Sequence, residues 1–140
     1  MKIDGGCHCG KITFVAEVDP EQVRVCHCTD CQTLTGTAFR VVVPAKKGTF
    51  ELRGAAPKTY VKTTADSGVP RLQGFCGDCG TPLYSMSVGD QPDKPYGLRV
   101  GAIRQRAQLV PKLQQWCRSS LGWTQSLGSL EKIAMQAPRG

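Results

Sequence analysis

Apolar and polar residues alternate with a period of two along much of the chain. Residues 11–18 (KITFVAEV) alternate through four apolar positions, Ile12, Phe14, Ala16 and Val18, which is typical of a strand with one buried face. Similar patterns predict strands over residues 38–44, 48–54, 58–64, 82–88, 96–103 and 112–118. Strands at this spacing, separated by turns, predict a mainly β domain of antiparallel sheets.

One segment favours a helix instead. In residues 29–36 (TDCQTLTG), Asp30 suits the beginning of a helix and Gly36 suits the position just beyond its end. Turn-forming residues at 19–22, 65–70 and 89–95 separate the predicted strands. The fold class we expect is therefore mainly β, with small antiparallel sheets and one short helix.

The chain contains no internal repeat, low-complexity tract or interdomain linker, so we expect a single domain over residues 1–140. Its core covers about residues 5–118, and residues 119–140 are expected to form a tail packed on the domain. A chain of 140 residues buries roughly 68–70% of its unfolded surface, which is enough for a core of its own.

The N-terminus, MKIDGGCHCG, has no apolar run, and no stretch approaches the ~18 apolar residues of a membrane span. We therefore expect a cytoplasmic protein without a membrane anchor. In a reducing compartment the 8 cysteines favour metal binding or catalysis over disulfides.

The formal net charge is +7 at pH 7, with every cysteine counted as neutral. Zinc bound by four thiolates carries −2 and zinc bound by three carries −1, so two such sites would lower +7 by three, to +4. Basic residues are spread from Lys2 to Arg139, and we interpret them as a solvated surface with a mild attraction for small anions. The even spread argues against nucleic acid as a partner.

Seven of the 8 cysteines fall into three clusters, Cys7-x-Cys9, Cys26-x-Cys28-x-x-Cys31 and Cys76-x-x-Cys79. A C-x-x-C turn followed by glycine directs two thiolates to one metal, and two such half-sites complete a tetrahedral Cys₄ site. Pairing the first cluster with the last predicts a structural zinc site of Cys7, Cys9, Cys76 and Cys79. Two disulfides or buried free thiols are the alternatives.

That pairing leaves Cys26, Cys28 and Cys31 as a set of three ligands. Structural zinc sites have four protein ligands, whereas catalytic zinc keeps one position for water or substrate. A soft metal held by three thiolates prefers a further thiolate, which indicates a thiol substrate. The alternatives are a second structural site completed by His8, His27 or Cys117, and a vacant cluster that oxidises.

The remaining candidates have simpler interpretations. In an extended segment, His27 points away from the ligand direction, so we interpret it as a hydrogen-bond donor behind the ligands or as exposed, and His8 likewise. Cys117, beside Trp116 in an alternating stretch, is predicted to be buried as a small apolar residue. The chain lacks G-x-x-x-x-G-K-[ST] and H-E-x-x-H, and its 2 histidines both lie in C-H-C motifs, which argues against a Ser/His/Asp hydrolase.

Three ordered segments, GGCHCGKITFVAEV, VCHCTDCQTLTGTAF and GFCGDCGTPLY, closely resemble the glutathione-dependent formaldehyde-activating enzyme family. The family pattern runs G-x-C-x-C-G, then C-x-C-x-x-C before a small-residue/Gly/Phe segment, then F-C-x-x-C-G-x-x-L. The resemblance covers about residues 5–118. Near its end, LQQWCRSSLGW is a looser match, so Trp116 and Trp123 are carried over without a role.

This resemblance implies small antiparallel sheets around zinc, a fold shared with a zinc-bearing accessory protein of Rab GTPases. It implies a structural zinc at the first and last cysteine pairs. A second zinc at Cys26, Cys28 and Cys31 would serve the joining of glutathione to formaldehyde as S-hydroxymethylglutathione. His27, Thr33 or Thr35 could meet the developing alkoxide.

The function predicted is thus a zinc-dependent carbon–sulfur lyase acting on glutathione, or another small thiol, and a small aldehyde, with two zinc sites per chain. The alternatives are a zinc-stabilised module that binds a protein or nucleic acid, and a thiol redox or metal-buffer protein using Cys26, Cys28 and Cys31.

Overall fold

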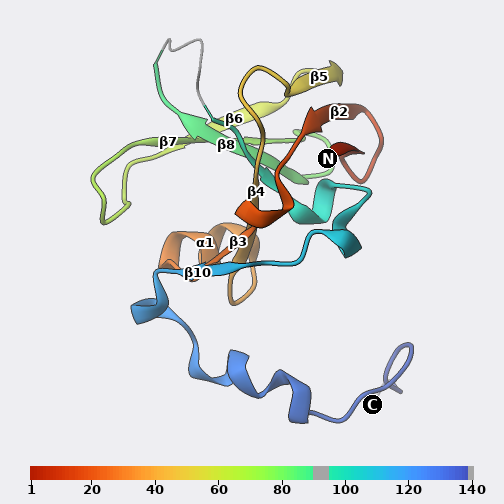
Figure 1. Ribbon diagram of the computed structural model, residues 1–140, viewed down its shortest axis with the longest axis vertical. Coiled ribbons are helices and arrows are strands. Elements are labelled where there is room, and N and C mark those ends of the chain that lie inside the picture. Colours follow the sequence, from red (N-terminus) through yellow and green to blue (C-terminus); the bar gives the residue numbers. More distant parts are fainter. Residues whose placement is uncertain (90–94, 139–140) are drawn as a thin grey trace.

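The computed structural model describes residues 1–89 and 95–138, which form a single domain of two β-sheets (Figure 1). The smaller sheet has three antiparallel strands in the order β1 (Lys2–Gly6), β2 (Ile12–Glu17) and β5 (Glu51–Gly54). The larger sheet has seven strands, in the order β10 (Leu113–Gln115), β3 (Arg24–Cys26), β4 (Arg40–Pro44), β9 (Gly97–Arg99), β8 (Pro82–Ser87), β7 (Arg71–Phe75) and β6 (Lys58–Lys62). The mainly β prediction is confirmed.

A single α-helix occurs in the described part of the chain, α1 (Thr29–Thr35). Cys28 caps its N-terminus by accepting a hydrogen bond from the Cys31 amide, and Gly36 ends it in the left-handed conformation with φ 68°. Short 3₁₀ turns form at η1 (Pro20–Gln22), η2 (Val100–Ala102), η3 (Arg106–Gln108), η4 (Cys117–Ser119) and η5 (Gly122–Ser129). The predicted helix over 29–36 is confirmed to within one residue.

Two of the predicted strands differ from the observed ones. The strand expected over 96–103 is limited to β9 and continues as η2, and the one expected over 112–118 is limited to β10. β10 pairs with β3 in parallel, whereas the other described strand pairs are antiparallel, as the sequence predicted. Alternation did not reveal β1, β3 or β7, because β1 and β7 contain glycine and β3 has only three residues. The predicted loop 89–95 lies almost entirely outside the described residues.

The core lies between the two sheets. Ile12 and Phe14 of the smaller sheet pack with Val43, Leu83 and Leu98 of the larger one, and all five are essentially inaccessible. An aromatic cluster covers one end of this core, with the Phe50 ring 5.4 Å from Tyr84 and 4.6 Å from Tyr96. Burial of this apolar area is the main stabilising term available to the domain.

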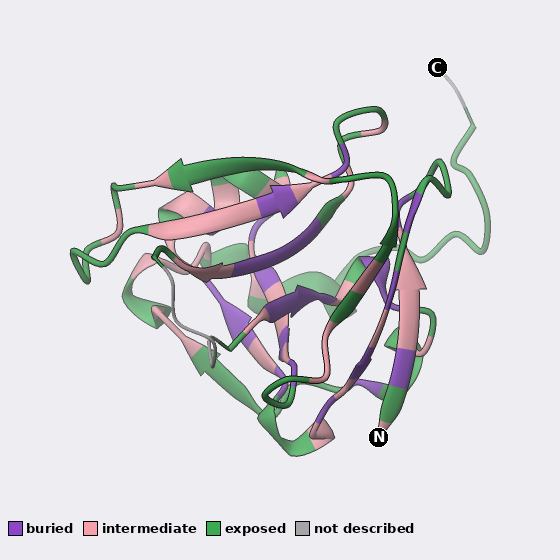
Figure 2. Ribbon diagram, turned by 90° about the horizontal axis from the view of Figure 1, so that it is seen from above, coloured by how far each residue is buried: buried purple, intermediate pink, exposed green. Residues whose placement is uncertain are grey.

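The C-terminal segment follows β10 and runs away from both sheets (Figure 1). Residues 125–138 are all exposed (Figure 2). Within the described residues, no helix has the length and apolar character needed to cross a bilayer.

Candidate metal centre and adjoining cavity

The cysteine thiols gather into the two predicted groups. Cys7, Cys9, Cys76 and Cys79 form one group and Cys26, Cys28 and Cys31 the other, with the sulfur atoms of each group within 4.8 Å of one another. All eight cysteines are free thiols, so neither group forms the disulfides that the sequence left open. Each group could hold a metal ion.

The geometry of the four-cysteine group fits zinc. A tetrahedral ion with Zn–S bonds of ~2.3 Å separates its sulfurs by about 3.8 Å. The Cys7 and Cys9 sulfurs lie 3.5 Å apart, and those of Cys9 and Cys76 lie 3.7 Å apart. Little movement would therefore be needed to accommodate the ion.

Glycine turns bring these thiols together. Gly10 and Gly80 have φ of 80° and 75°, and their amides donate to the carbonyls of Cys7 and Cys76 at 3.1 and 2.8 Å. This left-handed conformation is accessible to glycine without strain, as the sequence predicted for such turns. Hydrogen bonding by Thr81 lowers the pKa of the Cys79 thiol to about 5, which favours the thiolate that a metal requires.

The three-cysteine group lies where β3 passes into α1. Cys26 ends the strand, Cys28 is the helix cap, and Cys31 lies in the first helical turn. No histidine, carboxylate or fourth cysteine joins the group among the described residues. Cys117 is exposed rather than buried, which corrects our prediction, because β10 ends at Gln115 before the alternating pattern reaches Cys117.

Ionisation in this group is uneven. The hydrogen bond from the Cys26 thiol, together with the nearby charge of Arg40, lowers the pKa of Cys31 to about 5. The same contact and burial raise the pKa of Cys26, and burial raises that of Cys28. Three adjacent thiolates repel one another, so a cation is needed before all three can ionise. The donor set thus fits a thiophilic metal.

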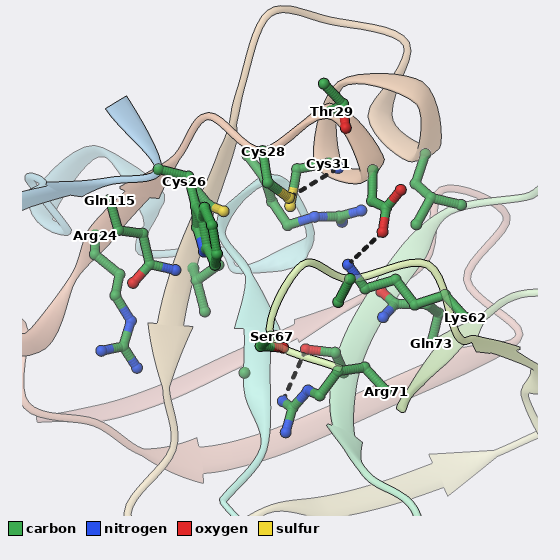
Figure 3. A pocket seen from close by; sticks show the side chains of 18 of the residues that line it. Arg24, Cys26, Cys28, Thr29, Cys31, Lys62, Ser67, Arg71, Gln73 and Gln115 are labelled. Carbon is green, nitrogen blue, oxygen red and sulfur yellow. Dashed lines mark hydrogen bonds and ion pairs between the residues drawn. The ribbon is translucent and has the colours of Figure 1, made fainter. Parts of the chain in front are cut away.

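A cavity of about 430 Å³ adjoins the three thiols. Its floor is one face of the larger sheet, and its walls come from α1, the β6–β7 connection and residues 115–119. Figure 3 shows Cys28 and Cys31 on one side of the hollow and Arg71 on the opposite side. The volume suits a small organic ligand and not only a metal ion.

Arginine is concentrated on this floor. Arg24, Arg40, Arg71 and Arg99 all line the cavity, although they come from four different strands. The strand registers explain the convergence, since Arg24 and Arg99 both pair with Val42, and Arg40 pairs with Cys26. These side chains are therefore not part of the evenly solvated surface that we inferred from the sequence.

Two ion pairs hold the walls of the cavity. Lys62 binds Asp30 at 3.1 Å, which joins β6 to α1, and Thr64 donates to the same carboxylate at 2.9 Å. Arg118 binds Asp66 at 2.6 Å, so the β6–β7 connection is linked to η4. Asp30 and Asp66, the carboxylates among the described lining residues, thus already have cationic partners.

Histidine and threonine contribute less than the sequence indicated. His27 is buried, which corrects the alternative of an exposed ring, and its Nε2 lies 2.8 Å from the Gln114 Oε1 of β10 rather than against a cysteine ligand. None of His27, Thr33 and Thr35 is among the cavity-lining residues of the described chain. Their place near the thiols is taken by Arg40, which alternation alone could not distinguish from a surface residue.

The two tryptophans differ in position. Trp116 lines the cavity with φ 58°, a conformation uncommon for a bulky residue, and the Arg118 guanidinium lies 5.2 Å from its ring centroid. Trp123 lies outside the cavity lining and is 58% exposed.

Comparison with known proteins identifies relatives of the chain. The model of the glutathione-dependent formaldehyde-activating enzyme family matches residues 2–119. A protein of Halomonas elongata, provisionally named for the same activity, is 26% identical over 87 residues, which cover 60% of this chain and 55% of that protein. The chain thus spans about half the length of this curated relative.

A crystal structure of a Rhodobacter sphaeroides protein has a similar fold, with a TM-score of 0.58 and 18% identity over 80% of this chain and 99% of that one. The family match covers most of the described domain, including both cysteine groups and the cavity floor. The chain therefore belongs to the glutathione-dependent formaldehyde-activating enzyme family.

Proposed function

We propose that this chain is a zinc-dependent enzyme of the carbon–sulfur lyase type, which forms and cleaves the adduct of glutathione, or another small thiol, with a small aldehyde. The observation that carries the proposal is the set of three thiols beside a cavity of about 430 Å³, with no fourth protein ligand among the described residues. Family membership supports the choice of thiol and aldehyde.

The reaction balances without a further reagent. The thiolate sulfur adds to the aldehyde carbon, a C–S bond forms, and the C=O π pair moves to the oxygen, which takes up a proton. Cleavage of the C–S bond reverses each step. Zinc bound at Cys26, Cys28 and Cys31 would supply a position for the thiol and lower its pKa.

Arg40 is the proposed source of positive charge at the reacting atoms. It is 5% exposed, its charge acts on Cys31, and its Nε has no hydrogen-bond partner among the described residues. A buried donor without a partner is costly, and an oxyanion formed beside the thiols would satisfy it.

The four-cysteine group has a different proposed role. Cys7, Cys9, Cys76 and Cys79 supply the full ligand number of a structural zinc site, so the group needs no substrate to complete it. It joins the β1–β2 turn to the β7–β8 turn and would hold the two sheets together.

Metal analysis and reaction kinetics test this function. Two zinc ions per chain are expected, one of them perturbed by glutathione. The zinc-loaded chain should equilibrate ¹³C-formaldehyde with glutathione faster than the spontaneous reaction does. Exchange NMR measures this rate. A single tightly bound zinc that does not respond to thiols would instead favour a zinc-stabilised binding module. Oxidation of the thiols without acceleration of the reaction would favour a thiol redox protein.

A further inference from the structure

Four arginines line the floor of the cavity. Within residues 1–89 and 95–138, no carboxylate forms an ion pair with Arg24, Arg40, Arg71 or Arg99. Asp30 and Asp66, the carboxylates that line the cavity, are bound to Lys62 and Arg118. Within the described residues, the arginines therefore have no carboxylate partner, and the charge of the Cys31 thiolate is the one that acts on Arg40 and Arg99.

Among the described residues, Arg71 and Arg99 donate their hydrogen bonds to neutral oxygens. Arg71 donates to Ser87 Oγ at 2.9 Å and to Ser85 Oγ at 3.3 Å, and Figure 3 shows its guanidinium across the hollow from Cys28. Arg99 donates to Gln73 Oε1 at 2.5 Å and is only 7% exposed. A buried guanidinium held by amide and hydroxyl oxygens retains its full charge, which is costly without an anion nearby.

Strand pairing places these groups on one patch of the floor. Gln73 of β7 pairs with Ser85 of β8, and Ser85 pairs with Gly97 of β9, two residues before Arg99. Arg71 and Gln73 are likewise two residues apart, so their side chains leave the same face of β7. Gly97 packs closely here, since an added Cβ would meet Val42 Cγ1 at 3.0 Å and Ser85 Oγ at 3.2 Å, so glycine lets β8 and β9 keep Ser85 beside Arg99.

We propose that Arg71 and Arg99 form a carboxylate-binding subsite on the cavity floor, oriented by Gln73 and Ser85. Guanidinium groups bind carboxylates through two parallel N–H···O bonds, and the cavity has room for an organic acid. The identity of the carboxylate rests on the proposed function: it belongs either to the thiol, as in glutathione, or to the carbonyl partner, as in an aldehydic acid.

Binding can be tested without turnover. S-methylglutathione keeps both carboxylates of glutathione but has no free thiol, and glyoxylate is the smallest aldehydic acid. Titration calorimetry on the zinc-loaded full chain should detect at least one of them, and Arg71→Gln should weaken that binding by about tenfold or more. Arg71→Lys, which keeps the charge but not the paired donors, should lie in between.

Arg53→Gln is the matched control, because Arg53 is exposed on β5 in the other sheet and its removal changes the net charge equally. It should leave both affinities within about twofold of the unmodified chain. Thermal unfolding of each variant verifies that the fold is kept. If neither ligand binds, or if Arg71→Gln and Arg53→Gln behave alike, the subsite is refuted.

Kinetics then identify the source of the carboxylate. If the thiol supplies the carboxylate, Arg71→Gln raises the KM for glutathione with either aldehyde. The KM for cysteamine, a thiol without a carboxylate, does not change. If the carbonyl partner supplies it, the KM for glyoxylate rises with either thiol and that for formaldehyde does not change. The two proposals can fail separately. If Arg71→Gln loses ligand binding but the unmodified zinc-loaded chain shows no turnover, the subsite is upheld and the proposed enzyme function is refuted.

Discussion

Cys28 has two separable roles in this structure, and its replacement tests both. Its sulfur is a member of the three-thiol group, and it also accepts the Cys31 amide hydrogen at 3.3 Å as the cap of α1. Serine is among the best capping residues, whereas alanine cannot accept this bond. Cys28→Ser should therefore remove the proposed metal ligand and keep the cap, and Cys28→Ala should remove both.

The expected magnitudes follow from the cap. Losing an N-cap acceptor costs about 1 kcal/mol, which for a domain of this size corresponds to a difference of roughly 3–4 °C in Tm between the serine and alanine variants. Both variants should fall from two zinc ions per chain toward one. Both should also equilibrate formaldehyde with glutathione no faster than the spontaneous reaction.

Differential scanning calorimetry, metal analysis and exchange NMR measure these three quantities. Cys117→Ser is the control, because Cys117 is exposed and belongs to neither thiol group, so its zinc content, Tm and turnover should not change. Turnover retained in Cys28→Ser would refute the open metal site. Equal Tm values for the serine and alanine variants would refute the capping role.

Three further changes probe the fold around the site. Cys76→Ser should release the zinc of the four-cysteine group and lower the free energy of unfolding by several kcal/mol, on the order expected for a structural zinc ligand; an unchanged Tm and zinc content would contradict this. Gly74→Ala should cost about 1–3 kcal/mol, because the added Cβ would overlap the buried Tyr84 ring, and chemical denaturation would measure it. Asp66→Asn should change stability by less than about 1 kcal/mol, since Asp66 and Arg118 are 64% and 70% exposed, and a larger loss would mean that this ion pair supports the fold.

Local sequence determined the chemistry of the two thiol groups. Spacings of two and three residues fix the half-sites in which neighbouring cysteines can share a metal, and glycine after a cysteine pair fixes the turn, because both depend on only a few neighbouring dihedral angles. The helix at α1 was predictable for the same reason, since Gly36 ends it within the segment itself. Counting ligands predicted the sorting into sets of four and three thiols, but the contact of Cys9 with Cys76 across 67 residues is made by the fold.

Only the tertiary structure decided what surrounds the second group. Alternation separates the two faces of a strand, but it cannot tell whether the polar face meets solvent or a cavity wall. Arg40, Arg71 and Arg99 are far apart in the sequence and meet because the strand order places β4, β9, β8 and β7 side by side. The burial of His27 likewise depends on the parallel pairing of β10 with β3. Strand order and register are set by long-range packing, so the arginine floor of the cavity emerges only when the chain folds.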